Sequence, residues 1–251
     1  MPTDPFHLSL LASLILLAAV LYSSVGHAGA SGYIAAMVLF GVATPMIKPT
    51  ALVLNILVAC VGTWRFASAG QVPWKLLGSL CIGSIPAAFL GGWIALPPRI
   101  YEPMLAACLV LAALRLIFAE GDTAPRAHPP LWGFIALGAL LGFVSGLTGI
   151  GGGIFLSPIL ILTGWENPRR TAATSAPFIL VNSISGLLGH ASSMQHIPAQ
   201  AALLAIVALC GGLFGSWLAV KKLRFPALRR ILALVMLVAA SKLVAELFRV
   251  E

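Results

Sequence analysis

The chain has 251 residues, of which 60% are hydrophobic and only 9% carry a charge. Soluble domains have about a quarter charged residues, so this composition excludes a soluble globular protein. The net charge of +8 does not indicate a nucleic-acid-binding protein, because the basic residues cluster in breaks between apolar runs, as in membrane proteins.

Apolar segments separated by proline, glycine and charged residues predict a series of helices. In the first half they cover residues 6–25, 32–44, 50–64, 76–96 and 103–118. In the second half they cover residues 131–147, 153–163, 171–189, 199–220 and 230–248. Several approach the roughly 20 residues that a membrane-spanning helix needs. The fold class is therefore all-α, a polytopic integral membrane protein.

The two halves have the same order of segment lengths, and their sequences match in places. SVGHAGASGYIAAMVLFG from Ser24 aligns with SGLTGIGGGIFLSPILIL from Ser145, so that Gly32 meets Gly153. Downstream, KPTA aligns with RRTA, and Asn55 aligns with Asn182. This pattern predicts two repeats, residues 1–122 and residues 123–251.

The distribution of basic residues predicts the orientation of the chain. If the N-terminus is outside and each half crosses the membrane an odd number of times, most Lys and Arg residues fall inside, as the positive-inside rule requires. Only Lys48, Arg99, Lys242 and Arg249, of the 15 basic residues, then fall outside. An odd number of crossings makes the repeats inverted in topology, which is typical of secondary transporters. Both termini are expected outside the cell.

The segment TGIGGGIF, which starts at Thr148, breaks an apolar run with several glycines. A glycine-rich turn that opens a helix presents free backbone N–H groups at the positive end of the helix dipole, and these bind anions. We therefore expect an anion site at the membrane midplane, formed by a broken or re-entrant helix pair in each half. The binding glycines are Gly149, Gly151, Gly152 and Gly153. A weaker counterpart in HAGASGY adds His27, Gly29, Ser31 and Gly32 as candidates for substrate binding.

Other polar residues inside apolar segments are further candidates for substrate binding. Asn55 and Asn182 take matched positions in the two halves, and Thr174 and Ser175 lie on the same segment as Asn182. Amide and hydroxyl groups can donate to the oxygens of an oxyanion, but hydrogen bonds between helices explain these residues equally well.

The stretches GLTGIGGGIFLSPILIL and TAATSAPFILVNSISG resemble the signature of the sulfite exporter TauE/SafE family, also called the toluene sulfonate uptake permeases. The doubled motif extends the resemblance over nearly the whole chain. The resemblance implies a secondary transporter that exports a small sulfur-containing oxyanion such as sulfite, sulfoacetate or another organosulfonate. Transport by alternating access in the cell inner membrane would follow.

Two histidines are candidates for carrying a coupling proton. His27 lies in the first glycine motif and His190 at the end of an apolar segment, and histidine changes charge near neutral pH. Glu102, Glu166 and Glu246 lie near segment ends, so a carboxylate proton relay is not expected. A structural role for both histidines is the alternative.

Two other functions remain open. An anion channel would use the same architecture, and an intramembrane serine protease would use Ser31 of the sequence GASG. We expect no enzyme, because the repeat accounts for that motif. No cofactor is expected, and no cluster of His, Cys, Asp and Glu has the spacing of a metal site. The expected partners are the lipid bilayer and a small anion, with the oligomeric state left open.

Overall fold

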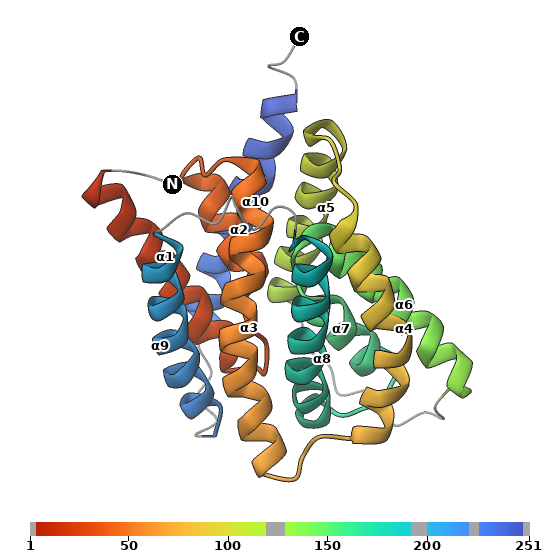
Figure 1. Cartoon of the computed structure of the whole chain (residues 1–251). Helices are drawn as coiled ribbons and strands as arrows, with labels where there is room; N and C mark the ends of the chain where they lie inside the picture. The colour runs from red at the N-terminus through yellow and green to blue at the C-terminus, as the bar shows by residue number, and fades with distance from the viewer. Residues whose placement is uncertain (1–3, 119–128, 192–199, 221–225, 248–251) are drawn as a thin grey trace.

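The computed structural model describes residues 4–118, 129–191, 200–220 and 226–247, and these residues form ten helices and no strand. Figure 1 shows the helices side by side in one bundle, with the two halves of the chain interleaved. Each helix lies on a segment that the apolar pattern predicts. The proposed boundary between residues 122 and 123 lies outside the described residues.

The helices of the first half are α1 (Pro5–Ser23), α2 (Ala30–Leu39), α3 (Thr44–Ser68), α4 (Trp74–Trp93) and α5 (Pro98–Phe118). Those of the second half are α6 (Leu131–Thr148), α7 (Gly153–Leu162), α8 (Pro168–Gly189), α9 (Ala201–Val220) and α10 (Pro226–Leu247). The start of α8 shows how local residues fix the beginning of a helix. Asn167 caps α8 by accepting a hydrogen bond from the Arg170 N–H at 2.9 Å, and Pro168 follows at the first helical position, where a missing N–H costs nothing.

Within the described ranges, six helices are long and apolar enough to cross a membrane: α1, α3, α4, α6, α8 and α9. The short helices α2 and α7 have 10 residues each. At 1.5 Å per residue each spans about 15 Å, half of a hydrocarbon core about 30 Å thick. The structure is therefore a multi-pass membrane protein in which two helices are too short to cross.

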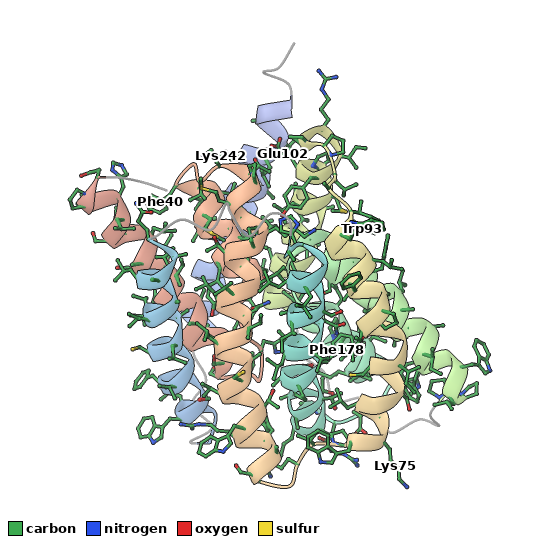
Figure 2. All side chains as sticks on the ribbon, in the orientation of Figure 1. Phe40, Lys75, Trp93, Glu102, Phe178 and Lys242 are labelled. Carbon is green, nitrogen blue, oxygen red and sulfur yellow. The ribbon has the colours of Figure 1, made fainter. Side chains whose placement is uncertain are left out.

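The surface and the ends of the molecule fit a membrane environment. Large apolar side chains are exposed on the sides of the long helices: Ile82 and Leu90 on α4, Leu140 on α6, Ile206 on α9. Figure 2 shows the labelled charged side chains at opposite ends, Lys75 at the lower end and Glu102 and Lys242 near the upper end. The apolar sides thus lie between two polar ends, as a bilayer requires.

Glycines allow neighbouring helices to pack very closely, as two pairs of helices show. A Cβ at Gly138, Gly142 or Gly146 of α6 would lie 2.0–2.3 Å from a carbonyl oxygen of α4, a spacing of four residues that is typical of tight membrane helix pairs. Leu80 of α4 contacts Gly138 of α6, and Ala88, eight residues later, contacts Gly146, also eight residues later. Residue numbers therefore increase in the same direction along both helices, so α4 and α6 are parallel. The same reasoning makes α1 and α9 parallel, since Leu16 meets Gly211 and Val20 meets Gly215.

The central pair, α3 and α8, is antiparallel. Gly62 meets Ala176, and the Asn55 amide lies 3.4 Å from the Ser183 hydroxyl. These contacts run in opposite directions along the two helices. Figure 1 shows α3 and α8 side by side at the centre, so each half contributes one long helix to the middle of the molecule.

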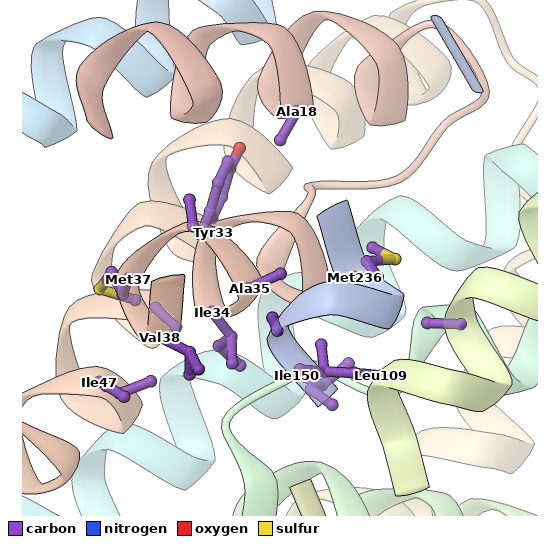
Figure 3. Close-up of a cluster of buried hydrophobic side chains, with 14 of the residues drawn as sticks. Ala18, Tyr33, Ile34, Ala35, Met37, Val38, Ile47, Leu109, Ile150 and Met236 are labelled. Carbon is purple, nitrogen blue, oxygen red and sulfur yellow. The ribbon is translucent and has the colours of Figure 1, made fainter. Parts of the chain in front are cut away.

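The short helix α2 is enclosed by protein. Every residue from Ala30 to Val38 is buried, and Figure 3 shows Tyr33, Ile34 and Met37 packed among residues of other helices, including Leu109 and Met236. A broken helix at membrane depth is tolerated only where protein or water surrounds it, because lipid cannot hydrogen-bond its free backbone groups. The burial of α2 meets that requirement.

One expectation about Lys48 is wrong. The sequence places it in a loop outside the bilayer, before a segment that begins at residue 50. Instead, α3 begins at Thr44, and Lys48 is buried within it, with 6% of its surface exposed. Its aliphatic stem packs over Gly149, so tertiary contacts carry the helix past the lysine and Pro49.

Candidate functional site

Two breaks in the helical structure meet in the interior of the molecule. The first lies between α1 and α2 and contains His27; the second lies between α6 and α7 and ends at Gly153. The His27 Nε2 atom is 3.2 Å from the Gly153 carbonyl oxygen and 2.7 Å from the hydroxyl of Ser157, one turn further along α7. His27 is only 6% exposed, so this contact between the halves is buried.

A chain of hydroxyl groups continues from His27 to α8. The Ser157 hydroxyl lies 2.8 Å from the Ser175 hydroxyl and donates to the Gly153 carbonyl at 3.0 Å. Both serines are at most 1% exposed. Hydroxyl groups can donate or accept as the partner demands, so the chain can adapt to a change in the protonation of His27.

The hydrogen bonds of His27 depend on its charge. Its Nδ1 atom lies 3.1 Å from the Val25 carbonyl oxygen, while Nε2 faces the Gly153 carbonyl oxygen. A neutral imidazole has one N–H and can donate to only one of these carbonyls, whereas an imidazolium can donate to both. Only a protonated His27 can therefore hold the Val25 carbonyl of the first break and the Gly153 carbonyl of α7 at the same time.

The second break is built from glycines with positive φ. Gly149 ends α6 with φ 79°, and Gly151 and Gly152 follow with φ 85° and 75°, a conformation that residues with a Cβ disfavour. Gly152 is the N-cap of α7. We find no hydrogen-bond acceptor among the described residues for the N–H groups of Gly151, Gly152 and Gly153, as the geometry of a helix start predicts.

Helices α3 and α8 hold this turn from two sides. The Asn55 amide donates to the Ile150 carbonyl at 3.2 Å, and a Cβ at Gly151 would lie 2.6 Å from the Asn55 Nδ2 atom. A Cβ at Gly153 would lie 2.4 Å from Ile179. The turn therefore needs glycine for close packing as well as for its φ angles.

Several fully buried polar atoms near the turn lack a partner in the described part of the chain. They include Asn55 Oδ1, Asn182 Oδ1 and Ser145 Oγ, and each of these residues is 0% exposed. The Cβ of Ser145 lies 3.4 Å from the position of a Cβ on Gly152. Because buried polar atoms are normally hydrogen-bonded, these atoms indicate a place for a ligand or water.

Other expected site residues take part in local structure. Thr174 donates to the Arg170 carbonyl at 2.8 Å and Asn182 donates to the Phe178 carbonyl at 2.8 Å, both within α8. The Asn55 amide hydrogens likewise point to Ile150 and Ser183. The amides of both asparagines therefore bind within the protein and leave an acceptor oxygen toward the interior.

The glycine motif of the first half is arranged differently from that of the second. Gly29 is the N-cap of α2 with φ 106°, and Gly32 is buried within the helix. The Ser31 hydroxyl lies 2.7 Å from the Tyr22 hydroxyl, and the Tyr33 hydroxyl donates to the Ala28 carbonyl. The neighbours of Ser31 are thus tyrosine and not histidine, which gives no support to a serine protease.

The two candidate histidines are far apart. His190 is the C-cap of α8, 15 residues beyond Ser175, so it lies about 22 Å along the helix from the His27 cluster at 1.5 Å per residue. Within the described residues, no group of three or more His, Cys, Asp and Glu side chains could hold a metal ion.

Comparison with known proteins gives the class and then the family. A "probable membrane transporter protein" of Sinorhizobium fredii is 40% identical over 231 residues, covering 90% of this chain and 93% of that protein. Proteins with the same description from Bacillus subtilis (24% over 230 residues, 83% and 84% covered) and Methanocaldococcus jannaschii (27% over 145 residues, 56% and 54% covered) are also similar. No solved structure shows a significant match. The multi-pass fold and these relatives define a membrane transporter rather than an enzyme.

The particular family follows from a model that matches most of the sequence. The model for "Sulfite exporter TauE/SafE" matches residues 11–243, which include both helix breaks and every candidate site residue. The chain therefore belongs to the sulfite exporter TauE/SafE family, and the resemblance seen in the glycine motifs is confirmed.

Proposed function

We propose that the protein is a secondary transporter that exports a small sulfur-containing oxyanion, such as sulfite, sulfoacetate or another organosulfonate, across the cell inner membrane. The observation that carries this proposal is the start of α7, where the N–H groups of Gly151, Gly152 and Gly153 are buried without an acceptor among the described residues. The Gly153 carbonyl at the same helix start contacts His27 and Ser157. Such a helix start binds an anion without a charged side chain. The family name supports the sulfur chemistry of the substrate.

The binding groups in this proposal are the N–H groups of Gly151, Gly152 and Gly153, with His27 and Ser175. Their neighbours Gly29, Ser31, Gly32, Asn55, Thr174 and Asn182 shape the surroundings and hold the two breaks in place. Gly149 ends α6, because its own N–H donates to the Ser145 carbonyl at 2.8 Å. His27 carries the coupling proton, because its protonation changes how the first break is joined to α7. His190 stays a second candidate for a proton carrier, at the end of α8.

Alternating access by two inverted repeats, with both termini outside, is the mechanism we propose. Helix contacts in the two halves correspond: α1 packs on α9 as α4 packs on α6, and α3 contacts α8. The antiparallel arrangement of α3 and α8 supports an inverted relation. Two ten-residue helices, each with a positive-φ glycine as N-cap, support pairing Gly29 with Gly152, two residues from the register of the sequence alignment.

The test uses the purified chain in proteoliposomes with radiolabelled sulfite and sulfoacetate. A secondary transporter gives saturable flux and counterflow, in which unlabelled substrate inside accelerates entry of label from outside. Flux without saturation or counterflow would make the protein an anion channel of the same architecture. No flux and no thermal stabilisation by sulfite, sulfoacetate, taurine, thiosulfate or sulfate would refute the proposed substrate class.

A further inference from the structure

Lys48 is a buried cation held by the end of a neighbouring helix. Its Nζ atom donates to the Gly91 and Gly92 carbonyl oxygens at 3.3 and 3.1 Å, which belong to the last turn of α4 (Trp74–Trp93). Lys48 is buried, with only 6% of its surface exposed to solvent. An ammonium group has three hydrogens, and these two carbonyls use two of them.

In the described ranges, no carboxylate lies within 4 Å of the Lys48 ammonium group. The ion pairs found there are His7 with Asp4 and Arg170 with Glu166. The nearest acidic group that hydrogen bonds place in this region is Glu102, which accepts from Thr44 at 3.2 Å, one helical turn before Lys48. A buried charge is costly unless an opposite charge is close. A helix C-terminus supplies only about half a negative charge, so Lys48 lacks a full counter-charge.

Lys48 also touches the glycine turn. The position of a Cβ on Gly149 lies 3.1 Å from Lys48 Cγ and 3.3 Å from its Cα and carbonyl oxygen. Gly149 is the first positive-φ residue of the break that ends at α7. The stem of Lys48 therefore packs on the turn whose next residues carry the free backbone N–H groups, and its ammonium group lies at the adjacent end of α4.

We propose that Lys48 is the cationic subsite of the transporter, which binds the negatively charged oxygen group of the substrate through its third hydrogen. The inference rests on the proposed function and adds a requirement to it: the substrate is a net anion, because its charge offsets that of Lys48. A neutral or zwitterionic compound of similar size should bind more weakly, because it offsets less of the charge of Lys48. Lys48 also discriminates by charge where the backbone N–H groups discriminate by geometry.

The competing role for Lys48 is structural, as a cap on the end of α4. Lys242 provides a matched control, because its Nζ atom caps α2 by donating to the Val38 and Leu39 carbonyl oxygens at 2.8 and 3.3 Å. That lysine lies on α10 and is partly exposed. A cap alone would make the two lysines equivalent in binding experiments.

The experiment measures the Kd of sulfite and sulfoacetate by calorimetry for wild type, Lys48→Met, Lys48→Gln and Lys242→Met in detergent. A hydrogen bond to a charged group contributes about 1.5–3 kcal/mol, so we expect Lys48→Met and Lys48→Gln to weaken binding by about 10- to 100-fold. Lys242→Met should stay within about twofold of wild type. Lys48→Gln keeps a donor for the α4 carbonyls, so it serves if Lys48→Met does not fold.

The outcomes separate the two proposals. Wild-type binding with unchanged Kd in Lys48→Gln, whatever its melting temperature, would overturn the subsite and leave the proposed function standing. Equal weakening by Lys242→Met would also overturn it, since a cap would then explain the effect. If wild type binds neither probe, both the proposed function and the subsite fall.

Discussion

The two helix breaks of this protein are closed in opposite ways. In the first, between α1 and α2, side chains hold the backbone. The Tyr22 hydroxyl pairs with the Ser31 hydroxyl, and the Tyr33 hydroxyl donates to the Ala28 carbonyl. His27 contacts Ser157 of α7. In the second, between α6 and α7, glycine backbone forms the turn, and the N–H groups of Gly151, Gly152 and Gly153 have no acceptor in the described part of the chain. A doubled sequence motif can therefore give one break held by side chains and one that, in our proposal, binds the substrate.

The largest effect should come from adding a methyl group to the second break. Gly151→Ala forces a side chain onto φ 85° and places its Cβ 2.6 Å from the Asn55 amide. Displacement of a binding group by 1 Å can cost about 100-fold in rate, so we expect a loss of sulfite flux of that order in proteoliposomes.

Gly70→Ala is the control for this variant. Gly70 also has positive φ, at 64°, but nothing lies within 4 Å of the position of its Cβ. It should lose only a little stability and keep its flux. Comparable losses of flux in both variants would mean that backbone strain, and not the site, explains the effect.

The second largest effect on flux should come from replacing His27, the side chain that connects the first break to α7. His27→Gln removes the charged form that can donate to both carbonyls, and we expect flux to fall about 10-fold and to lose any dependence on a pH gradient that proton coupling through His27 would give. His7→Gln is the matched control, since His7 is exposed and pairs with Asp4. A pH profile that His27→Gln leaves unaltered would remove His27 from coupling.

A third prediction distinguishes glycines that bend the chain from glycines that let helices touch. Gly83→Ala would place a Cβ 2.1 Å from the Ile135 carbonyl oxygen of α6, and overpacking costs about 1–3 kcal/mol. Gly78, also on α4, has nothing within 4 Å, so Gly78→Ala should be neutral or stabilising by up to about 1 kcal/mol. Thermal unfolding in detergent measures both, and equal melting temperatures would contradict the close α4–α6 packing.

The smallest effect compares one tyrosine at each break. Tyr33 donates to the Ala28 carbonyl in the first break, and Tyr101 of α5 donates to the Thr148 carbonyl at 3.2 Å beside the second. Replacing either with Phe should cost about 1 kcal/mol of stability. Only Tyr101→Phe should also weaken sulfite binding, by about threefold. Weaker binding in Tyr33→Phe alone would reverse the roles assigned to the two breaks.

Local sequence signals predicted the helices and the second break, because apolar length, proline and clustered glycine act on the chain nearby. The contacts of the site could not be predicted in the same way. Asn55 donates to Ile150, 95 positions away, and His27 reaches Ser157, 130 positions away; both depend on how the halves pack. Lys48 was missed because a lysine beside a proline is typical of a loop, whereas here tertiary packing extends α3 over both.

The sequence also contains a glycine pattern that predicts close helix packing. The spacing of Gly138, Gly142 and Gly146 is that of a tight membrane helix pair, and the structure places all three against α4. The conformational glycines of the turn, by contrast, follow one another closely, at positions 149, 151 and 152. Spacing of four residues and close succession are thus separate signals, one for helix contact and one for a broken backbone.

The most direct test locates the bound anion. Selenite is a chemical analogue of sulfite whose selenium gives an anomalous X-ray signal, so crystals soaked in selenite reveal its position. The account predicts a peak within about 4 Å of the backbone nitrogens of Gly151, Gly152 and Gly153, close to His27 and Ser157. A selenite peak elsewhere in the bundle, with none at the start of α7 under conditions that saturate binding, would contradict it.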